Sequence, residues 1–192
     1  MKSQQIRCWK TENPLYIRYH DEEWGVPVHD DKKLFELLVL EGFQAGLTWE
    51  LILKRREALR KALADFNPVT IAKFSTAEAE NILKNPEVIR NRAKIQATIN
   101  NAKRFIQIQN EFGSFDRFIW QFVNGKPLDH AFKSMSEMPP QTDESRAMSK
   151  ELKKRGFKFV GPTICYAFMQ AVGMVNDHLI TCFRYKQIQK RS

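Results

Sequence analysis

Apolar residues recur at helical spacing along most of this 192-residue chain. The clearest example is a stretch that ends at Gly113, in which the apolar residues are Ile95, Ile99, Ala102 and Ile106. Side chains three or four positions apart share one face of a helix, so this spacing predicts a long amphipathic helix. Alternation of apolar and polar residues, which would indicate strands, gives no convincing signal anywhere in the sequence. The pattern therefore predicts an all-α fold.

Residues that favour helix ends divide this pattern into separate elements. Asp, Ser and Thr cap the first turn of a helix, and Gly ends helices because it tolerates the left-handed conformation. On these signals, helices begin at Asp30 or Asp31 (ending near Gly42), at Thr48 (continuing to about Asp65), at Asn67-Pro68, at Ser75, at Ser114 and at Thr142. An apolar helix is expected between Gly156 and Gly173. The first thirty residues and residues 125–141 are expected to be irregular, and no element is assigned after Cys182.

Length and composition favour a single domain over residues 1–192, with at most two helical lobes around one cleft. The net charge of +9 and the pI of about 9.5 favour a polyanionic partner, most commonly nucleic acid. No run of eighteen apolar residues is present, so no membrane partner is expected. The N-terminus lacks the apolar stretch of a signal peptide, and we expect a cytoplasmic monomer.

Four soft metal ligands stand near the two ends of the chain. His178 and Cys182 are four residues apart, which puts them on one face of a helix. Cys8 and His20 would complete a Cys₂His₂ set suited to tetrahedral zinc, although their spacing is wider than in a zinc finger. Such a site would be structural, since four protein ligands leave no open position for water. The alternative is that the cysteines are buried core residues and the histidine lies on the surface.

One carboxylate falls on the apolar face of its predicted helix. Leu34, Leu37, Leu38 and Glu41 follow the spacing i, i+3, i+4, i+7, which places Glu41 among apolar residues near the C-terminal end of the helix. A carboxylate there meets the negative end of the helix dipole and little water. The spacing therefore indicates a functional acid. The alternative is that the helix frays before Glu41 and lets the side chain reach solvent.

Aromatic residues are dense on either side of this acid. They include Tyr16, Tyr19, Trp24 and Trp49. Aromatic residues usually belong to an ordinary core. In a basic protein, aromatic rings beside one partly buried acid also form a pocket for a flat cationic ring.

The segment 156–163 (GFKFVGPT) lies between two predicted helices. Its Gly156 and Gly161 let the backbone approach a ligand, and the N–H groups of the turn and of the following helix attract phosphate. Lys158 and residues 153–155 (KKR) surround it with positive charge. This layout is typical of a helix-hairpin-helix motif, which holds DNA by its backbone without reading sequence. The alternative is a plain helical hairpin with a solvated basic face.

Four separated segments resemble the type I 3-methyladenine DNA glycosylases. They are residues 14–25 (PLYIRYHDEEWG), 40–49 (LEGFQAGLTW), 153–161 (KKRGFKFVG) and 175–178 (VNDH). The resemblance runs from about residue 7 to residue 182, nearly the whole chain, and the segments agree in order. It implies the helix-hairpin-helix DNA glycosylase architecture, with a zinc staple that joins the N-terminal and C-terminal segments.

The resemblance also implies roles for individual residues. One structural zinc ion per chain would be bound by Cys8, His20, His178 and Cys182. Glu41 would hydrogen-bond the flipped base. The walls of the base pocket would be the rings of Tyr16, Tyr19, Trp49, Trp9 and Trp24. The contacts with DNA would come from Gly156, Lys158, Gly161, Gln44 and Leu47, with Leu47 as the apolar wedge that fills the space left by the base.

The reaction that the resemblance implies is excision of 3-methyladenine from double-stranded DNA containing alkylated purines, by hydrolysis of the N-glycosidic bond. Methylation at N3 already makes the base cationic in the nucleotide, so its departure needs no protonation. Many related glycosylases carry an Asp where we align Asn176, and Asn cannot act as a base. The enzyme is therefore expected to work mainly by flipping, gripping and orienting the base. No lysine nucleophile is apparent, so strand-cleaving lyase activity is not expected.

Two other classes of protein fit part of the pattern. A non-catalytic, zinc-stapled DNA-binding module explains the charge, the hairpin and the metal ligands equally well. It does not explain an acid on an apolar helix face beside so many aromatic residues. An RNA-binding protein, whose aromatic residues stack on unpaired bases, is a weaker third alternative.

Overall fold

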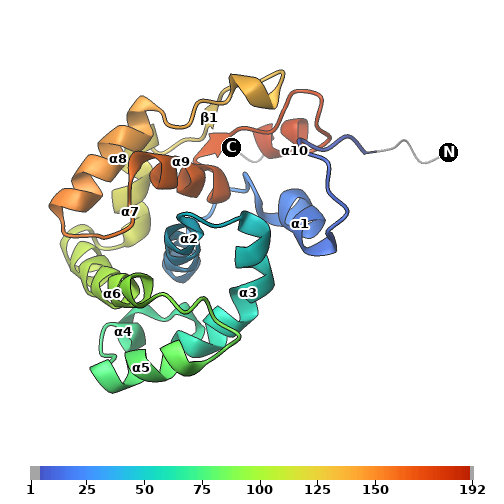
Figure 1. Ribbon diagram of the computed structural model, residues 1–192. Helices are drawn as coiled ribbons and strands as arrows, with labels where there is room; N and C mark the ends of the chain where they lie inside the picture. The colour runs from blue at the N-terminus through green and yellow to red at the C-terminus, as the bar shows by residue number, and fades with distance from the viewer. Residues whose placement is uncertain (1–4, 191–192) are drawn as a thin grey trace.

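The structure, a computed structural model, describes residues 5–190 and is mostly helical (Figure 1). The longer elements are α1 (Pro14–Arg18), the π-helix η1 (Tyr19–Glu23), α2 (Asp31–Gln44), α3 (Trp49–Ala62), α4 (Pro68–Ile71), α5 (Thr76–Lys84), α6 (Arg92–Phe112), α7 (Phe115–Trp120), α8 (Asp143–Lys154), α9 (Pro162–Ala171) and α10 (Tyr185–Gln189). Short 3₁₀ turns are η2 (Ala64–Phe66), η3 (Gln121–Val123) and η4 (Met135–Glu137). The prediction of a mainly helical fold is confirmed.

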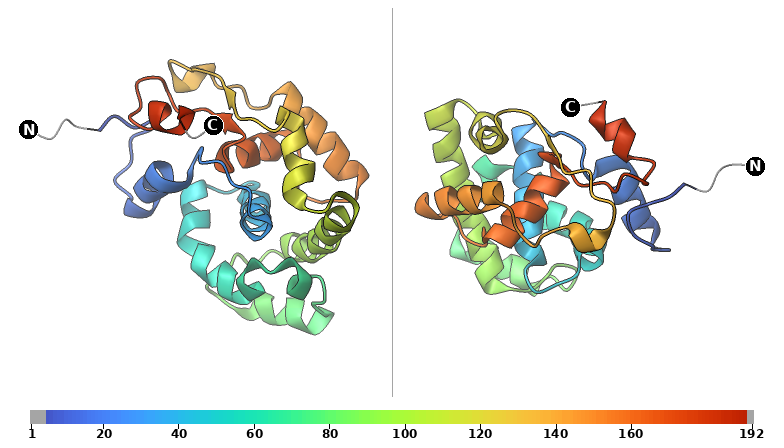
Figure 2. Two further views of the ribbon diagram at one scale, coloured as in Figure 1. Left: turned by 180° about the vertical axis from the view of Figure 1, so that it is seen from behind. Right: turned by 90° about the horizontal axis from the view of Figure 1, so that it is seen from above.

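Helix α2 lies at the centre of the molecule, and the other helices surround it in every view (Figures 1 and 2). Its apolar side chains Leu34, Leu40 and Phe43 are almost completely buried, and so are its polar residues Glu36 and Glu41. A helix packed on all sides has no solvated face, so any acid on it must find partners within the protein or remain unpaired. Glu36 has such partners, whereas Glu41 is unpaired among the described residues.

The expected capping residues start the observed helices. The side chain of Asp30 accepts a hydrogen bond from the backbone of Lys33, and Thr48 does the same for Leu51. Ser75 forms a capping box at the start of α5. Two ends differ from the prediction: α2 continues past Gly42 to Gln44, and α3 ends at Ala62, where a 3₁₀ turn follows.

The prediction that the first thirty residues are irregular is wrong. Asn13 caps α1, with Pro14 at the first helical position. The chain then widens into η1, a π-helix that continues directly from α1. π-Helical turns are often found at functional sites. This one places the consecutive residues Tyr19 and His20 in two different buried environments, an aromatic pocket and a cluster of metal ligands.

The prediction that no strand occurs is also corrected, in one detail. β1 (Leu128–Asp129) pairs in parallel with β2 (Val175–Asn176), with Leu128 opposite Val175. Apart from this strand and η4, residues 125–141 are irregular, as expected. The tail beyond Cys182, to which no element was assigned, contains α10.

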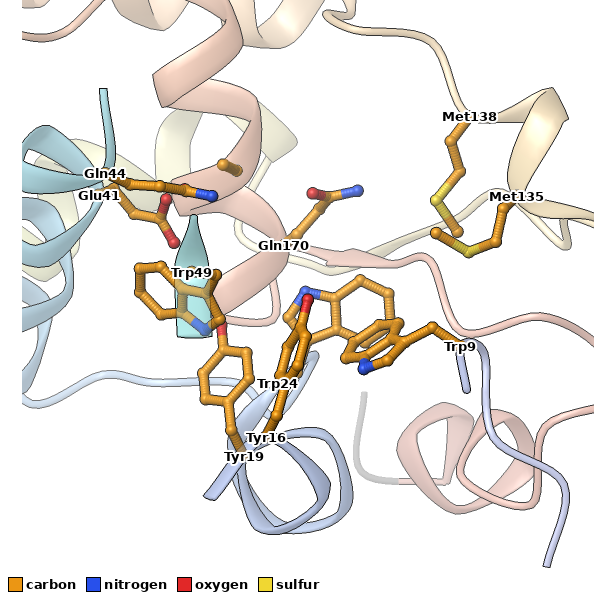
Figure 3. Close-up of a pocket in the computed structure, with 11 residues that line it drawn as sticks. Trp9, Tyr16, Tyr19, Trp24, Glu41, Gln44, Trp49, Met135, Met138 and Gln170 are labelled. Atoms are coloured by element: carbon orange, nitrogen blue, oxygen red, sulfur yellow. The ribbon is translucent and has the colours of Figure 1, made fainter. Parts of the chain in front are cut away.

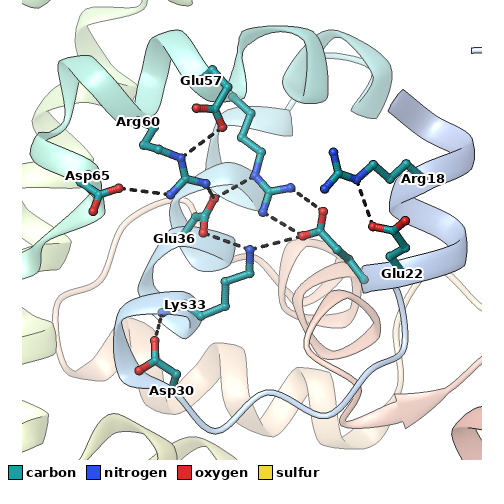
Figure 4. A network of polar contacts seen from close by, with 10 residues as sticks. Arg18, Glu22, Asp30, Lys33, Glu36, Glu57, Arg60 and Asp65 are labelled. Atoms are coloured by element: carbon teal, nitrogen blue, oxygen red, sulfur yellow. Dashed lines mark hydrogen bonds and ion pairs between the residues drawn. The ribbon is translucent and has the colours of Figure 1, made fainter. Parts of the chain in front are cut away.

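Glu36 is the acid of α2 that finds partners (Figure 4). Its carboxylate accepts hydrogen bonds from Arg56 at 2.8 Å, Arg60 at 2.6 Å and Lys33 at 3.1 Å. Arg56 also forms two bonds of 2.9 Å with Glu23 at the end of η1. Burial alone would raise the pKa of Glu36, but the charges of Arg56 and Lys33 keep it below its ordinary value. This network fastens η1, α2 and α3 together.

Among the helices of residues 5–190, none is long and apolar enough to cross a membrane.

Candidate active site and metal centre

A cavity of about 230 Å³ opens beside the C-terminal half of α2 (Figure 3). It is lined by Trp9, Tyr16, Tyr19, Trp24, Glu41, Gln44, Trp49, Met135, Met138, Ala167 and Gln170. All five aromatic residues that the sequence predicted are therefore brought together around the predicted acid. They come from the N-terminal segment, from α1, from η1 and the residue that follows it, and from the first residue of α3. Of these elements, the Glu36 network fastens η1 and α3 to α2.

The aromatic rings of the pocket pack against one another. The centroid of the Trp9 ring lies 5.1 Å from that of Tyr16 and 4.9 Å from that of Trp24. On the other side, the centroids of Tyr19 and Trp49 are 5.1 Å apart. These separations are those of favourable aromatic pairs. The walls are therefore held in place without a ligand, which reduces the entropy lost when a flat ring enters.

Glu41 is the acid of α2 that remains unpaired. It is 3% exposed, and its Oε2 has no hydrogen-bond partner among the described residues. Burial raises the pKa of Glu41 to about 8. A buried acid with a strongly raised pKa in a cavity is a candidate functional group, because a charged ligand would supply the missing partner.

Two hydrogen-bond donors of the pocket are also without partners in the described part of the chain. They are the indole nitrogens of Trp9 and Trp49. Buried polar groups are rarely left unsatisfied, since each costs about 1–3 kcal/mol. The residues that line the pocket thus include one unpaired acceptor and two unpaired donors as well as aromatic rings, and such groups can hold a heteroaromatic ring.

A second cluster lies directly behind the pocket. Its members are Cys8, His20, His178 and Cys182; they are all buried, and their potential ligand atoms lie within 4.8 Å of one another. The sulfur of Cys8 is 3.4 Å from Nδ1 of His178. The sulfur of Cys182 is 3.6 Å from Nδ1 of His178 and 3.6 Å from Nε2 of His20. The structure thus brings the four predicted ligands together as a group that could hold a metal ion.

Each histidine of the cluster is oriented by a hydrogen bond on its far side. Nε2 of His178 lies 2.9 Å from the carbonyl oxygen of Trp24, and Nδ1 of His20 lies 2.7 Å from a carboxylate oxygen of Asp21. Both partners are acceptors, so these nitrogens carry the hydrogen and the opposite nitrogens offer a lone pair to the cluster. Such outer contacts are usual for metal-binding histidines.

The two cysteines of the cluster behave as a pair. Their mutual hydrogen bond lowers the pKa of the Cys182 thiol and raises the pKa of the Cys8 thiol. Burial is the second cause, and it raises the pKa of both thiols. The backbone N–H groups of Leu179 and Arg184 donate to the two sulfurs at 3.4 and 3.5 Å. One thiolate is therefore stabilised before any metal binds, and thiolates are the form in which cysteine ligates metals.

The predicted hairpin is the turn between α8 and α9. Gly156 adopts a left-handed conformation (φ 85°), and Gly161 precedes α9 with open space around its Cα. Two side chains of α6 hold the turn: Asn101 exchanges bonds of 2.8 Å with the backbone of Lys158, and Asn100 donates to the carbonyl oxygen of Gly156 at 2.8 Å. Lys158 is exposed.

One basic residue beside the hairpin is already engaged. Arg155 was predicted to add to the positive charge around the turn, but it forms ion pairs with Glu111 at 2.6 Å and Glu151 at 2.8 Å. The basic residues in this region that remain exposed are Lys153, Lys154 and Lys158.

The loop between α2 and α3 contains the predicted wedge. Leu47 is partly buried against the core, whereas the side chain of Gln44 lines the pocket, a position that the sequence did not indicate. Lys94 of α6 donates to the carbonyl oxygens of Phe43 at 2.7 Å and Ala45 at 2.6 Å. A buried ammonium group thus caps the C-terminus of α2 and holds the start of this loop.

Sequence reasoning missed Met135, Met138, Ala167 and Gln170. The two methionines come from the irregular segment around η4, which carries no periodic signal, and they overhang the pocket (Figure 3). Gln170 did carry a signal, because it is a polar residue in the last turn of an otherwise apolar helix. The aligned residue Asn176 does not line the pocket: it is buried in β2, and its side chain donates to the carbonyl oxygen of Tyr185 at 3.4 Å.

The fold and the pocket together define a helical protein that receives one flat ring beside a buried acid, as enzymes that act on a flipped nucleic-acid base do. The chain belongs to the methyladenine glycosylase family, whose sequence model matches residues 9–185.

Several known proteins are similar over nearly their whole length. DNA-3-methyladenine glycosylase 1 of Escherichia coli is 50% identical over 180 residues, which cover 93% of this chain and 96% of the relative. The DNA-3-methyladenine glycosylase of Haemophilus influenzae is 47% identical over 177 residues, or 92% and 96%. A crystal structure of a 3-methyladenine DNA glycosylase I matches with a TM-score of 0.90 at 50% identity, covering 93% and 98%. The Staphylococcus aureus enzyme, solved to explain 3-methyladenine recognition, matches with a TM-score of 0.88 at 39% identity, covering 90% and 92%.

Proposed function

We propose that this protein is a DNA-3-methyladenine glycosylase that removes the methylated base from alkylated DNA. The observation that carries the proposal is the unpaired, buried carboxyl group of Glu41 inside a preformed aromatic pocket. A cationic ring with hydrogen-bond donors at its edge supplies what this site lacks, a positive charge and a partner for the acid. Neutral adenine supplies the donors but not the charge.

The chemistry requires little from the protein beyond binding. The bond between C1′ and N9 breaks, its electron pair stays on N9 and neutralises the base, and water adds its oxygen to C1′ while its proton goes to solvent. Glu41 stabilises the cationic base in the flipped position, and each ring face adds cation–π attraction of about 0.5–2 kcal/mol. Holding base and sugar in one orientation supplies the rest.

Zinc is the metal that best fits the four-ligand cluster. Tetrahedral zinc, with bonds of about 2.3 Å to sulfur and 2.0–2.1 Å to nitrogen, separates sulfur and nitrogen ligands by about 3.5 Å. The sulfur–nitrogen distances of 3.4 and 3.6 Å support this geometry. An ion held by Cys8, His20, His178 and Cys182 would fix the back of the pocket. Trp9 follows Cys8 in the chain and packs against His20, and Trp24 packs against His178. With four protein ligands it would be structural.

DNA would be held by a helix-hairpin-helix formed by α8, the turn and α9. The open space at Gly161, the N-terminus of α9 and the exposed Lys158 support contacts with phosphates. Leu47 is placed on the loop beside the pocket and would fill the gap left by the flipped base. Gln44 would contact the base or its sugar, because its side chain lines the pocket.

The direct test is chromatography of the bases released from methylated duplex DNA. The wild-type protein should release 3-methyladenine, and Glu41→Gln should release it much more slowly. A protein that binds the duplex but releases no base would be the non-catalytic DNA-binding module, and the proposal would then be wrong.

A further inference from the structure

Gln170 presents one defined end of its amide to the pocket. Its Nε2 donates a hydrogen bond of 2.7 Å to Oδ2 of Asp177, which lies behind the pocket wall. A carboxylate only accepts hydrogen bonds, so the nitrogen must face Asp177 and the oxygen must face the other way. In Figure 3 the oxygen of Gln170 lies on the side nearer Glu41. Gln170 therefore adds a second acceptor to the pocket.

Asp177 is held so that it cannot turn away from Gln170. Its side chain is fully buried and receives three groups: the hydroxyl of Tyr166 at 2.5 Å and the amide of Gln170 on Oδ2, and Nδ1 of His130 at 2.6 Å on Oδ1. Rotation of the carboxylate would break contacts on both oxygens, which in a buried site is costly. The orientation of Gln170 is thus determined by a rigid group outside the pocket.

We propose that Gln170 is a specificity-determining residue which accepts a hydrogen bond from the exocyclic amino group of the flipped base, and that Asp177 is the positioning residue that directs its amide oxygen. This inference rests on the proposed function. An amino group at position 6 has two N–H bonds, and Glu41 and Gln170 offer one acceptor each. A base with a carbonyl oxygen at that position, such as 3-methylguanine, would place this hydrogen-bond acceptor opposite the acceptors of Glu41 and Gln170. The pocket therefore selects amino-bearing, adenine-type lesions.

The first experiment distinguishes the role of Gln170 from that of Glu41 by comparing two ligands in two proteins. Binding of free 3-methyladenine and of 3-methylpurine, which lacks the amino group, is measured by quenching of the pocket tryptophans in wild type and in Gln170→Met. Met keeps the length and unbranched shape of Gln but accepts no comparable hydrogen bond. The ratio of the dissociation constants of 3-methylpurine and 3-methyladenine should be at least fivefold smaller in Gln170→Met than in wild type.

Equal ratios in the two proteins would overturn the role of Gln170. They would leave the proposed function intact, provided that wild type still binds 3-methyladenine and releases it from methylated DNA. Failure of wild type in that release assay would instead contradict the proposed function.

The second experiment tests the positioning role of Asp177 with a matched control. Asp177→Ala removes the acceptor of Gln170 Nε2, whereas Tyr166→Phe removes a different hydrogen bond to the same carboxylate oxygen. Asp177→Ala should reduce the discrimination between the two ligands as Gln170→Met does, and should reduce it no further when combined with Gln170→Met. Tyr166→Phe should leave the discrimination unchanged.

A merely structural role would make Asp177→Ala and Tyr166→Phe alike in ligand discrimination, and that result would overturn the positioning role. Because Asp177 precedes the metal ligand His178, metal content and thermal unfolding are measured for each variant. If Asp177→Ala does not fold, Asp177→Leu, which has a similar shape and offers no acceptor, takes its place, with the same expected result and the same overturning result.

Discussion

At the scale of single residues, the molecule treats its two buried acids in opposite ways. Glu36 is surrounded by Arg56, Arg60 and Lys33, whereas no cation within residues 5–190 pairs with Glu41, and burial raises the pKa of Glu41 to about 8. Both sit on α2, five residues apart, so the difference comes from what the neighbouring helices bring to each face. The free protein keeps one acid uncompensated, and a cationic ligand can relieve that cost only at Glu41.

Under subsaturating conditions, Glu41→Gln should slow the release of 3-methyladenine at least tenfold, because it keeps the shape of the side chain but removes the charge that attracts the cationic base into the flipped position. Tenfold corresponds to about 1.4 kcal/mol of transition-state stabilisation. Single-turnover release from methylated duplex measures it. Glu50→Gln, an exposed acid in the first turn of α3, is the control and should release base at the wild-type rate. Equal losses in both variants would contradict a specific role for Glu41.

The same carboxyl group should make base release depend on pH. Only the ionised form attracts the cation, and burial raises the pKa of Glu41 to about 8. Under subsaturating conditions, the single-turnover rate should therefore rise from roughly pH 6 through pH 8 and level off at about pH 9. Glu41→Gln should show a flat profile over this range. A wild-type profile as flat as that of the variant would exclude titration of Glu41.

Stability should show the opposite trend with pH. A carboxyl group whose pKa is higher in the folded protein holds its proton more tightly there, so its contribution to stability is complete below the ordinary value of 4.5 and is lost as the pH rises to about 8. Between pH 5 and pH 8, wild type should lose up to about 3 kcal/mol relative to Glu41→Gln. Urea unfolding of both proteins at the two pH values measures the change, and an unchanged difference would mean that Glu41 is ionised throughout.

At the scale of elements, α6 organises the proposed DNA-contacting surface. Near its N-terminus, Lys94 holds the loop after α2, and two turns later Asn100 and Asn101 hold the hairpin between α8 and α9. The loop and the hairpin are far apart in the sequence, but one rigid helix sets their separation. A fixed separation suits a duplex, whose phosphates are regularly spaced.

The two glycines of the hairpin should respond differently to substitution. Gly161 has an ordinary φ of −63° and open space around it, so Gly161→Ala should leave the melting temperature unchanged. It should weaken binding to damaged and undamaged duplexes alike if phosphate approaches this backbone. Gly156→Ala should lower stability by about 1 kcal/mol or more, because φ is 85° and its Cβ would lie 3.0 Å from Arg104. Fluorescence anisotropy and thermal unfolding measure the two effects.

A loss of affinity in Gly161→Ala confined to damaged DNA would contradict the placement of this turn on the phosphate backbone. Binding by wild type should also weaken steeply with salt, as expected for contacts that displace counterions.

The sequence predicts helices that have a periodic apolar pattern or a capping residue better than it predicts segments that have neither. Helices α2 to α9 follow from apolar spacing and from caps such as Thr48 and Ser75, and helical spacing alone placed Glu41 on a buried face. The π-helix η1 was missed because nothing in its residues distinguishes wide helical turns from a loop. Met135 and Met138 were missed because an irregular segment reaches the pocket only through tertiary packing.

At the scale of the whole molecule, the four-ligand cluster joins the ends of the chain. Cys8 and His20 are far from His178 and Cys182 in the sequence, so a metal bound there would close a loop that runs from Cys8 to Cys182. Closing such a long loop costs conformational entropy, and binding of a metal would offset that cost.

Loss of one ligand should therefore cost much more than loss of another buried cysteine. Cys8→Ala should bind metal poorly and melt more than about 10 °C below Cys165→Ala, a difference of roughly 3 kcal/mol or more for a chain of this size. Cys165 is the matched control, because it is equally buried but lies in α9, away from the cluster. Elemental analysis and thermal unfolding measure the two effects, and wild type without zinc would contradict the metal assignment.

The cluster also imposes an order on the assembly of the pocket during synthesis. A ribosome makes Cys8 and His20 long before His178 and Cys182. Trp9 and Trp24, which line the pocket, pack against the rings of His20 and His178 respectively. A nascent chain that has not reached His178 and Cys182 therefore lacks half of the groups that could hold a metal ion behind the pocket, and its Trp24 lacks the ring of His178, against which it packs.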